Sequence, residues 1–487
     1  MNELITHLND AIWGYVLIAA LVLCGLWFTW KTKGVQFRMI GEMFRLLGDS
    51  GNTQPQESGP DPNAQQKHIS SFQAFAVSLA SRVGTGNLAG VATAIAIGGP
   101  GAVFWMWLMA LLGAATAFVE STLAQLFKQK HNESFIGGPA YYIYKGLHSK
   151  WLACVFAVLI TLTFGFSNTS IQANTICSAM NEAFGWNPLV VGIVIAVLAL
   201  LIVFGGIRRI AQVSSVLVPI MAVGYVLVAV IVVVMNIRLV PHVLKVIVEG
   251  AFGIQQVAGG IFGATIMAGI KRGLFSNEAG EGSAPNAAAT AHVSHPVKQG
   301  LIQALGVFTD TLLVCSCTAF IILISGLYAR PELNGIALTQ AAMQSEIGAF
   351  GPTLIAIAVF LFAFSTIIGN NYYGEVNIRF MLDSAKNAKL STFNSQLIIT
   401  LYRLMSCGLV VLFGAKASLQ TVWNIGDLFM ALLTACNLFA IVALGKYAFR
   451  LLDDYVAQKK RGIREPVFHK RDLPELENEI DCWGDEQ

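Results

Sequence analysis

The chain has 487 residues, of which 55% are hydrophobic and only 12% are charged. Soluble domains carry about a quarter charged residues, so this composition excludes an ordinary soluble domain and predicts an integral membrane protein. The net charge of +3 is small and most basic residues lie between apolar segments, so no nucleic-acid partner is expected.

Eleven apolar runs are long enough to cross a bilayer, which takes about 20 residues of helix. They cover approximately residues 12–30, 72–97, 101–127, 151–177, 188–205, 211–235, 247–276, 300–327, 353–377, 396–414 and 421–445. Lys31 and Lys33, rather than small residues, follow the first run, which favours a retained helix over a cleaved signal peptide. We therefore predict an all-α polytopic membrane protein with eleven transmembrane helices.

The basic residues are distributed unequally between the two sides of these spans. Of the 31 lysines and arginines, 25 fall in segments on the side of the C-terminus and four fall on the other side. Cytoplasmic loops carry the excess of positive charge, so the N-terminus is expected outside and the C-terminus inside.

The first inside segment, residues 31–71, begins with an amphipathic pattern. Its apolar residues recur at helical spacing with basic residues between them, which predicts an interfacial helix; they are Phe37, Ile40, Met43, Phe44 and Leu47. A solvated linker is expected over residues 49–66. At the other end, residues 446–487 form a charged cytoplasmic tail without a motif, for which we expect disorder or short helices.

The stretch "SRVGTGNLAG", residues 81–90, is too polar for a simple membrane helix. Gly84 and Gly86 face different sides of a helix and flank Thr85, so the backbone can leave the helical path there. Amides freed in this way attract a carboxylate, and freed carbonyls bind a hard cation such as sodium. The alternative is a glycine-rich face for helix packing.

The span over 247–276 is also rich in glycine, and we expect an interruption between Gly259 and Gly269. Residues 1–30 form an extra first helix, and the ten later spans divide into five within 72–235 and five within 236–445. Each half would then begin with an interrupted helix, an arrangement in which transporters build a site at the bilayer midplane.

Other spans carry isolated polar groups. Ser365 and Thr366 are adjacent hydroxyls that could serve a ligand or bond to their own helix. Glu120 and Asp310 are acids within spans, suited to cation binding, proton transfer or pairing with Arg82 or Arg403. The sequence shows no phosphate-binding loop, zinc motif or nucleophile elbow, so we expect neither an enzyme nor an organic cofactor.

Three longer motifs resemble those of one known family. The segments "GGPGAVFWMWLMALLG", "RVGTGNLAGVATAI" and "GLFSNEAGEGSAPNAAA" are similar to the signatures of the alanine/glycine:cation symporters, also named sodium:alanine symporters. The resemblance covers nearly the whole chain. It implies the leucine-transporter fold, in which two inverted five-helix repeats carry discontinuous first and sixth core helices.

The resemblance also implies roles for individual residues. Small amino-acid substrate would contact Thr85, Gly86 and Asn87, with Gln172 facing the same region, and the sixth-helix break would supply Phe262, Gly263 and Thr265. Sodium would bind the carbonyls of Ala80 and Val83 and the hydroxyls of Ser365 and Thr366. Arg82, Glu120 and Asp310 are candidates for coupling or gating.

The expected function is sodium-driven import of alanine, glycine or glutamine by alternating access, in a bacterial inner membrane. The alternative within the same fold is proton coupling through Glu120 or Asp310. A channel and a membrane-embedded enzyme are the rivals of other classes. The sequence leaves open the substrate preference, the ion stoichiometry and the oligomeric state, for which a monomer suffices.

Overall fold

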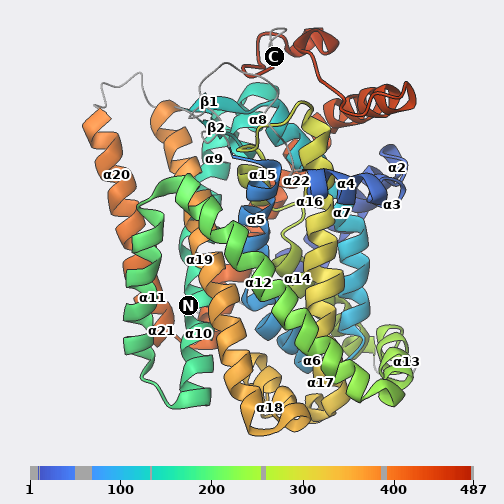
Figure 1. The fold of residues 1–487 in the computed structure, drawn as a ribbon, viewed down its shortest axis with the longest axis vertical. Coiled ribbons are helices and arrows are strands. Elements are labelled where there is room, and N and C mark those ends of the chain that lie inside the picture. Colours follow the sequence, from blue (N-terminus) through green and yellow to red (C-terminus); the bar gives the residue numbers. More distant parts are fainter. Residues whose placement is uncertain are drawn as a thin grey trace.

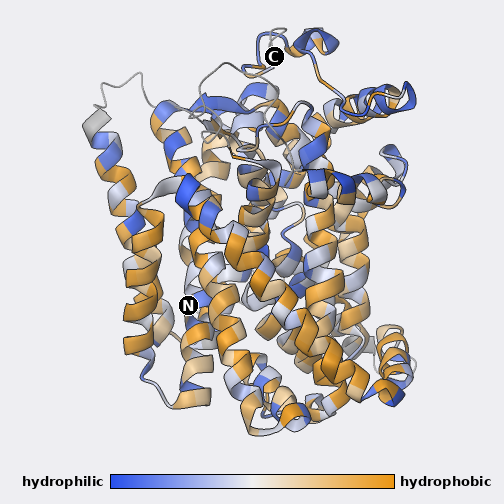
Figure 2. Cartoon of the chain, in the orientation of Figure 1, coloured by the Kyte–Doolittle hydropathy of each residue, from blue (hydrophilic) through white to orange (hydrophobic). Residues whose placement is uncertain are grey.

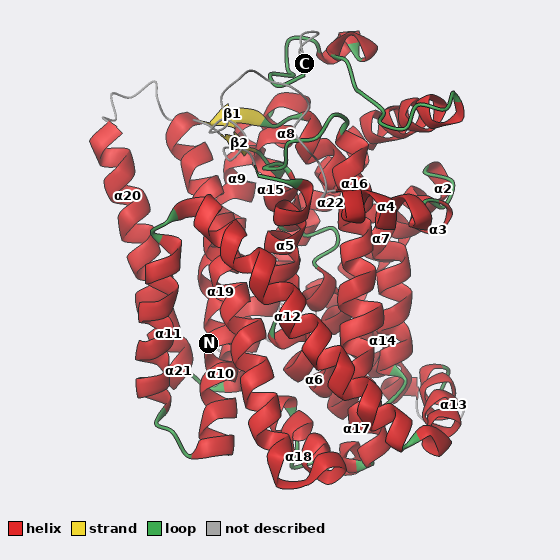
Figure 3. Cartoon of the chain, in the orientation of Figure 1, coloured by secondary structure: helices red, strands yellow, loops and turns green. Residues whose placement is uncertain are grey.

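The computed structural model describes residues 9, 11–49, 69–131, 134–253, 259–384 and 392–483. Most of the linker predicted over 49–66 therefore lies outside the described residues. The described chain is a bundle of long helices, with one short hairpin near the C-terminal segment (Figures 1 and 3). The hairpin pairs β1 (Gln129–His131) with β2 (Ser134–Ile136) in antiparallel register.

The first half of the bundle runs to Met235. Its helical segments are η1 (Ile12–Leu17), α2 (Ile18–Lys31), α3 (Val35–Arg38), α4 (Ile40–Asp49), α5 (Ser71–Arg82), η3 (Gly86–Gly90), α6 (Val91–Gly98), α7 (Ala102–Leu126), α8 (Pro139–Gly146), α9 (Lys150–Ile160), η4 (Thr161–Asn168), α10 (Thr169–Phe184), α11 (Pro188–Val203) and α12 (Gly206–Met235).

The second half begins with a short connecting segment. Its helical segments are η5 (Ile237–Leu239), α13 (Val240–Ala251), α14 (Gly259–Asn277), α15 (Ala284–Ala288), α16 (Pro296–Val307), η6 (Phe308–Cys315), α17 (Ser316–Ser325), η7 (Leu327–Ala329), α18 (Gly335–Ile347), η8 (Gly348–Phe350), α19 (Gly351–Ser384), α20 (Thr392–Leu404), η9 (Met405–Val410), α21 (Val411–Lys416), α22 (Leu419–Lys460), η10 (Lys470–Asp472) and η11 (Pro474–Leu476).

Seven helices among the described residues are long and apolar enough to cross a membrane, and three shorter apolar helices accompany them. Hydrophobic residues predominate along the long outer helices (Figure 2). On α12, for example, Val216, Ile220, Val223 and Leu227 are each at least 60% exposed. Such a continuous apolar exterior is stable against lipid and not against water, so the bundle is a membrane-embedded protein.

The centre of the bundle is the first interrupted helix. Ser70 caps α5, because its hydroxyl accepts from the Gln73 amide while the Gln73 side chain accepts from the Ser70 amide. From Ala74 to Arg82 every side chain of α5 is buried. Helices α12, α16 and α19 pack around α5, which explains why this helix tolerates polar residues that lipid would not.

The second interruption lies elsewhere than the sequence suggested. Helix α14 is continuous from Gly259 to Asn277, so the interruption predicted between Gly259 and Gly269 is wrong. The chain leaves the helix only after Asn277, where Glu278, Gly280 and Gly282 have positive φ values of 55°, 93° and 80°. Glycine lacks the Cβ atom that makes a positive φ unfavourable for other residues. Gly280 and Gly282 therefore allow the chain to leave the helical path here.

The C-terminal segment contains the short helices η10 and η11, one of the two alternatives expected for it, and residues 461–483 also pack against the bundle, which was not expected. The Trp483 indole donates to the Gln125 carbonyl at 3.2 Å, and the Phe468 amide donates to the Ser294 carbonyl at 2.9 Å. Lys145 pairs with Asp481 at 2.6 Å. These contacts join the segment to α7, α8 and the loop before α16.

Helices α3 and α4 together occupy the amphipathic pattern at the start of residues 31–71, with Phe37 in α3. Met43 is fully buried, while Phe37, Ile40 and Phe44 are exposed beside the bundle. Arg45 and Glu42 pair within the helix at 2.7 Å, and Glu42 also accepts from Tyr455 of α22 at 2.6 Å. The helix is thus anchored to α22, and its position at a membrane surface stays a prediction.

Candidate functional site

The first break exposes carbonyl oxygens to two hydroxyls of α19. The Thr366 hydroxyl lies 2.8 Å from the Ala80 carbonyl oxygen and 3.5 Å from that of Val83. The Ser365 hydroxyl lies 3.3 Å from the same Ala80 oxygen. The structure therefore brings together the four residues that the sequence assigned to sodium.

A fifth oxygen belongs to this group, and the sequence did not single it out. The Phe362 carbonyl accepts from Ser365 at 2.8 Å and from Thr366 at 3.1 Å. The hydroxyls therefore bond to their own helix and also reach across to α5. Five neutral oxygens in a buried space match the preference of a hard monovalent cation for oxygen donors.

Gly84 makes this approach sterically possible. A Cβ at this position would lie 2.5 Å from the Thr366 hydroxyl and 2.8 Å from the Gln172 side-chain oxygen. Real Cβ atoms do not approach so closely, so α10 and α19 can close on the break only where residue 84 lacks a side chain.

Gln172 joins α10 to the break. Its side-chain oxygen accepts from the Thr85 amide at 2.9 Å, and its nitrogen donates to Asn168 at 2.9 Å. The Thr85 hydroxyl is buried and has no hydrogen-bond partner among the described residues. An unpartnered buried hydroxyl at the start of η3 is a position where a polar ligand would be bound.

Asn87 is held at both ends of its amide. Its oxygen accepts from the Gly84 amide at 2.9 Å, which stabilises the break. Its nitrogen donates to Asp310 at 2.6 Å. Ser276 and Thr311 donate to the other oxygen of Asp310 at 2.6 and 2.8 Å. In this conformation Asn87 connects the break to η6 and α14, and substrate contact through its side chain stays a prediction.

Phe262, Gly263 and Thr265 lie in the unbroken part of α14, so their carbonyls are within a regular helix. The Thr265 hydroxyl donates to the Gly98 carbonyl at 2.7 Å, where it ties α14 to the end of α6. The structure does not bring these three residues to the first break. These residues were expected to bind substrate because the helix was predicted to be interrupted there. This interruption is absent.

The true second break carries two buried acids that the sequence analysis passed over. Glu278 accepts from Ser81 at 2.9 Å and from Ser283. Glu281 is 1% exposed. Both lie in the segment "GLFSNEAGEGSAPNAAA", whose two acids among glycines and serines were the available signal.

Glu120 faces this second break from α7. It accepts from the Gly280 amide at 3.3 Å and from the Asn437 side chain at 2.9 Å. Arg82 is buried nearby, and its charge acts on Glu120, Glu278 and Asp310. The Arg82 guanidinium donates to the Gln303 carbonyl at 3.1 Å, while Nε and Nη2 have no hydrogen-bond partner among the described residues.

Arg403, the alternative partner for the buried acids, belongs to a separate cluster. It pairs with Glu375 of α19 at 2.8 Å.

A second ion-pair cluster joins α14 to α22. Lys271 and Arg272 of α14 pair with Asp427 of α22 at 2.7 and 2.8 Å. The predicted topology counts these two basic residues on the inside. The Arg272 guanidinium also stacks over Trp423, 4.2 Å from its ring centroid.

Three short π-helical segments surround the polar residues of the site. Asn87 lies in η3, Asn168 in η4 and Asp310 in η6. A π-helical turn shifts side chains out of the regular helical register and is frequent at functional sites. This shift is one reason why helical spacing in the sequence does not predict that Asn87, Asn168 and Asp310 lie at one site.

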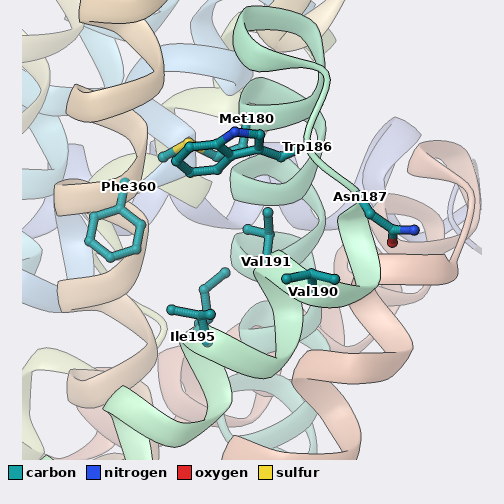
Figure 4. Close-up of a pocket in the computed structure, with 8 residues that line it drawn as sticks. Met180, Trp186, Asn187, Val190, Val191, Ile195 and Phe360 are labelled. Carbon is teal, nitrogen blue, oxygen red and sulfur yellow. The ribbon is translucent and has the colours of Figure 1, made fainter.

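A cavity of about 410 Å³ lies away from this cluster, between α10, α11 and α19 (Figure 4). Met180, Trp186, Val191, Ile195 and Phe360 line it, and its walls are almost entirely apolar. It offers no convergent polar groups for an amino acid, so we place the candidate site at the break and not in this cavity.

Comparison with known proteins gives consistent matches over the whole chain. The family model described as "Sodium:alanine symporter family" matches residues 1–470. The probable sodium/glutamine symporter GlnT of Bacillus subtilis is 48% identical over 99% of this chain and 97% of its own length. The amino-acid carrier protein AlsT of the same organism is 49% identical over 100% and 98%.

A more distant relative is the sodium/alanine symporter AgcS of Methanococcus maripaludis, which is 35% identical over 91% of this chain and 94% of its own. Among solved structures, a mutant manganese transporter of Eremococcus coleocola is 15% identical over 85% of this chain and 84% of its own, with a TM-score of 0.47. The family model and the relatives agree on transporters, not enzymes. The chain belongs to the sodium:alanine symporter family.

Proposed function

We propose that this protein imports a small neutral amino acid together with sodium by alternating access. Alanine and glycine are the preferred candidates, and glutamine is the third because of the name of one relative. The observation that carries the proposal is the group of five buried oxygens contributed by Ala80, Val83, Phe362, Ser365 and Thr366.

Sodium in this group would join α5 to α19 at the break. The ion would accept lone pairs from the three carbonyls and two hydroxyls, and the hydroxyl protons would turn away from it. Binding the cation therefore fixes the relative position of the two helices. Gly84 and Thr85 follow directly in the chain, so the same event orders the residues expected to bind substrate.

The substrate carboxylate would lie at the start of η3, near the amide of Gly86 and the hydroxyl of Thr85. The combined helix from Gly86 to Gly98 directs its amino-terminal end to this point, where a negative charge is stabilised. Gln172 holds the Thr85 amide from the other side. A site closed by α10 and α19 this tightly would exclude large side chains.

The larger architecture of the proposal follows the family resemblance. Eleven transmembrane helices would comprise one extra helix and two inverted five-helix repeats within 72–235 and 236–445. The N-terminus would lie outside and the C-terminal segment in the cytoplasm of a bacterial cell. Arg82, Glu120 and Asp310 would couple the two breaks through the contacts described above.

Uptake by purified protein in liposomes tests the function directly. Labelled alanine, glycine and glutamine are offered under an inward sodium gradient, with choline replacing sodium in the control and the pH equal on both sides. We expect accumulation above equilibrium only with sodium. Accumulation driven by a pH gradient without sodium would refute sodium coupling. Flux that never exceeds equilibrium would indicate a channel, and chemical conversion of the amino acid an enzyme.

A further inference from the structure

Four buried carboxyl groups lie around the two breaks, and three of them have hydrogen-bond donors at both oxygens. Glu120 is held by Gly280 and Asn437, and Glu278 by Ser81 and Ser283. Asp310 is held by Asn87, Ser276 and Thr311. Donors at both oxygens stabilise the ionised form of a carboxyl group.

Glu281 is the exception among these four. It is 1% exposed, and its Oε1 atom has no hydrogen-bond partner among the described residues. An ionised carboxylate buried without donors costs several kcal/mol, and proteins avoid this cost by neutralising the group or supplying a cation.

The ionisable groups around Glu281 come from several elements. Glu278 shares its loop and Glu120 faces it from α7, while Arg82 of α5 brings a positive charge. Asp427 of α22 also acts on Glu281, but it is itself paired with Lys271 and Arg272. Arg82 already acts on three other carboxyl groups. The hydroxyl of Tyr142 in α8 donates to Asn437 and not to Glu281. What distinguishes Glu281 is its geometry: it is buried and no donor among the described residues reaches its Oε1 atom, so an ionised form would be uncompensated there.

The position of Glu281 couples its protonation to the backbone. It lies between Gly280 and Gly282, which both have positive φ. Gly280 is held at both ends, because its amide donates to Glu120 and its carbonyl accepts from Asn437 at 2.9 Å. If the break moves, these bonds change and Glu281 leaves its dry surroundings. Water around the carboxyl group would then allow it to ionise.

We propose that Glu281 is a proton-binding site that is protonated in the conformation described here and releases its proton when the second break moves during transport. The inference rests on the proposed transport function. The bound species is a proton, the bond is the O–H bond of the Glu281 carboxyl group, and water accepts the proton on release. Each return to the conformation described here requires a proton to be taken up again.

The consequence is a defined dependence of transport on pH. Reprotonation becomes slower as protons become scarcer, so sodium-driven uptake should fall on the alkaline side by up to about tenfold per pH unit. Glu281→Gln carries a permanently neutral side chain and should give a flat profile. Glu281→Asp keeps a titratable group in a different position and should give a profile that is still pH-dependent but displaced along the pH axis.

The test is the rate of sodium-driven alanine uptake in liposomes from about pH 6 to about pH 9, with equal pH on both sides and saturating sodium. Glu332→Gln, which changes an exposed acid, is the matched control and should retain the wild-type profile. Equal profiles for wild type and Glu281→Gln would overturn the proposal. A flat profile for Glu120→Gln, with Glu281→Gln unchanged, would assign the proton to Glu120 instead.

Two further outcomes are separable. Absence of sodium-driven uptake in the wild type, at every pH, would contradict the proposed function and not the proton site. If Glu281→Gln does not fold, as judged by gel filtration, Glu281→Asp decides the question, because an undisplaced profile for that variant would overturn the proposal.

Discussion

The residues of the first break depend on one another at the level of single atoms. Gly84 provides the space in which the Thr366 hydroxyl and the Gln172 side chain meet the backbone. The Gly84 amide is in turn fixed by the side chain of Asn87. A change at residue 84 therefore acts on the proposed cation site and on the proposed substrate site together.

We expect Gly84→Ala to abolish sodium-driven uptake. The new methyl group would overlap the Thr366 and Gln172 side chains, so α10 and α19 could close only after displacement, at a cost of about 1–3 kcal/mol or more. Gly224→Ala on the outer face of α12 is the matched control, since a Cβ there meets nothing within 4 Å. Equal uptake by the two variants would contradict the described packing around the break.

At the scale of elements, the two helix interruptions differ in how well the sequence predicts their positions. The first break could be predicted, because polar residues and paired glycines stand out in an otherwise apolar run. The second break could not be located from glycine content. Gly263 and Gly269 lie within continuous α14, and Gly269 provides room for the Ala102 carbonyl of the neighbouring helix. Glycine in a membrane helix can serve close packing without interrupting the helix.

The second break has its own test in Gly282→Ala. Residue 282 has φ of +80°, and a Cβ would lie 2.7 Å from Pro139 and 2.9 Å from Asn437. We expect loss of uptake, or loss of folded protein on gel filtration. Gly326→Ala controls for backbone strain alone, because φ is +70° and nothing lies within 4 Å, so it should cost only about 1–2 kcal/mol. Wild-type uptake by Gly282→Ala would contradict a tightly packed break.

At the scale of the whole molecule, the C-terminal segment, α4 and the end of α22 form one connected assembly. Glu465 joins Arg45 and Lys298, and Glu42 joins Arg45, Tyr455 and Lys459. Composition predicted the membrane class and helical content, and motif resemblance predicted the family. The packing of residues 461–483 could not be predicted, because its charged residues find partners only through contacts distant in sequence.

Because of this assembly, we expect the free energy of unfolding to decrease at acid pH. Burial alone would raise the pKa of Glu42, but hydrogen bonds from Arg45, Tyr455 and Lys459 lower it from 4.5 to about 2. A lowered pKa in the folded state adds stability above pH 4.5 that is lost as the pH falls toward 2. We expect Glu42→Gln to destabilise the protein by about 1 kcal/mol at neutral pH and to have little effect near pH 2.

Thermal unfolding of the detergent-solubilised protein at several pH values measures this difference. Glu477→Gln, which changes an exposed acid of the C-terminal segment, should leave the unfolding temperature unchanged at every pH. A difference between wild type and Glu42→Gln that is independent of pH would show that the charge of Glu42 is not what stabilises the assembly.

The central claim, that sodium binds between α5 and α19 at the first break, is tested most directly by the sodium dependence of alanine uptake in Thr366→Ala. Removing one oxygen donor should raise the sodium concentration for half-maximal uptake by about tenfold or more, while the order of preference among amino acids is retained. Thr434→Ala removes a buried hydroxyl that donates to the Met430 carbonyl of its own helix, α22, and should behave as wild type. An unchanged sodium dependence in Thr366→Ala would contradict the claim.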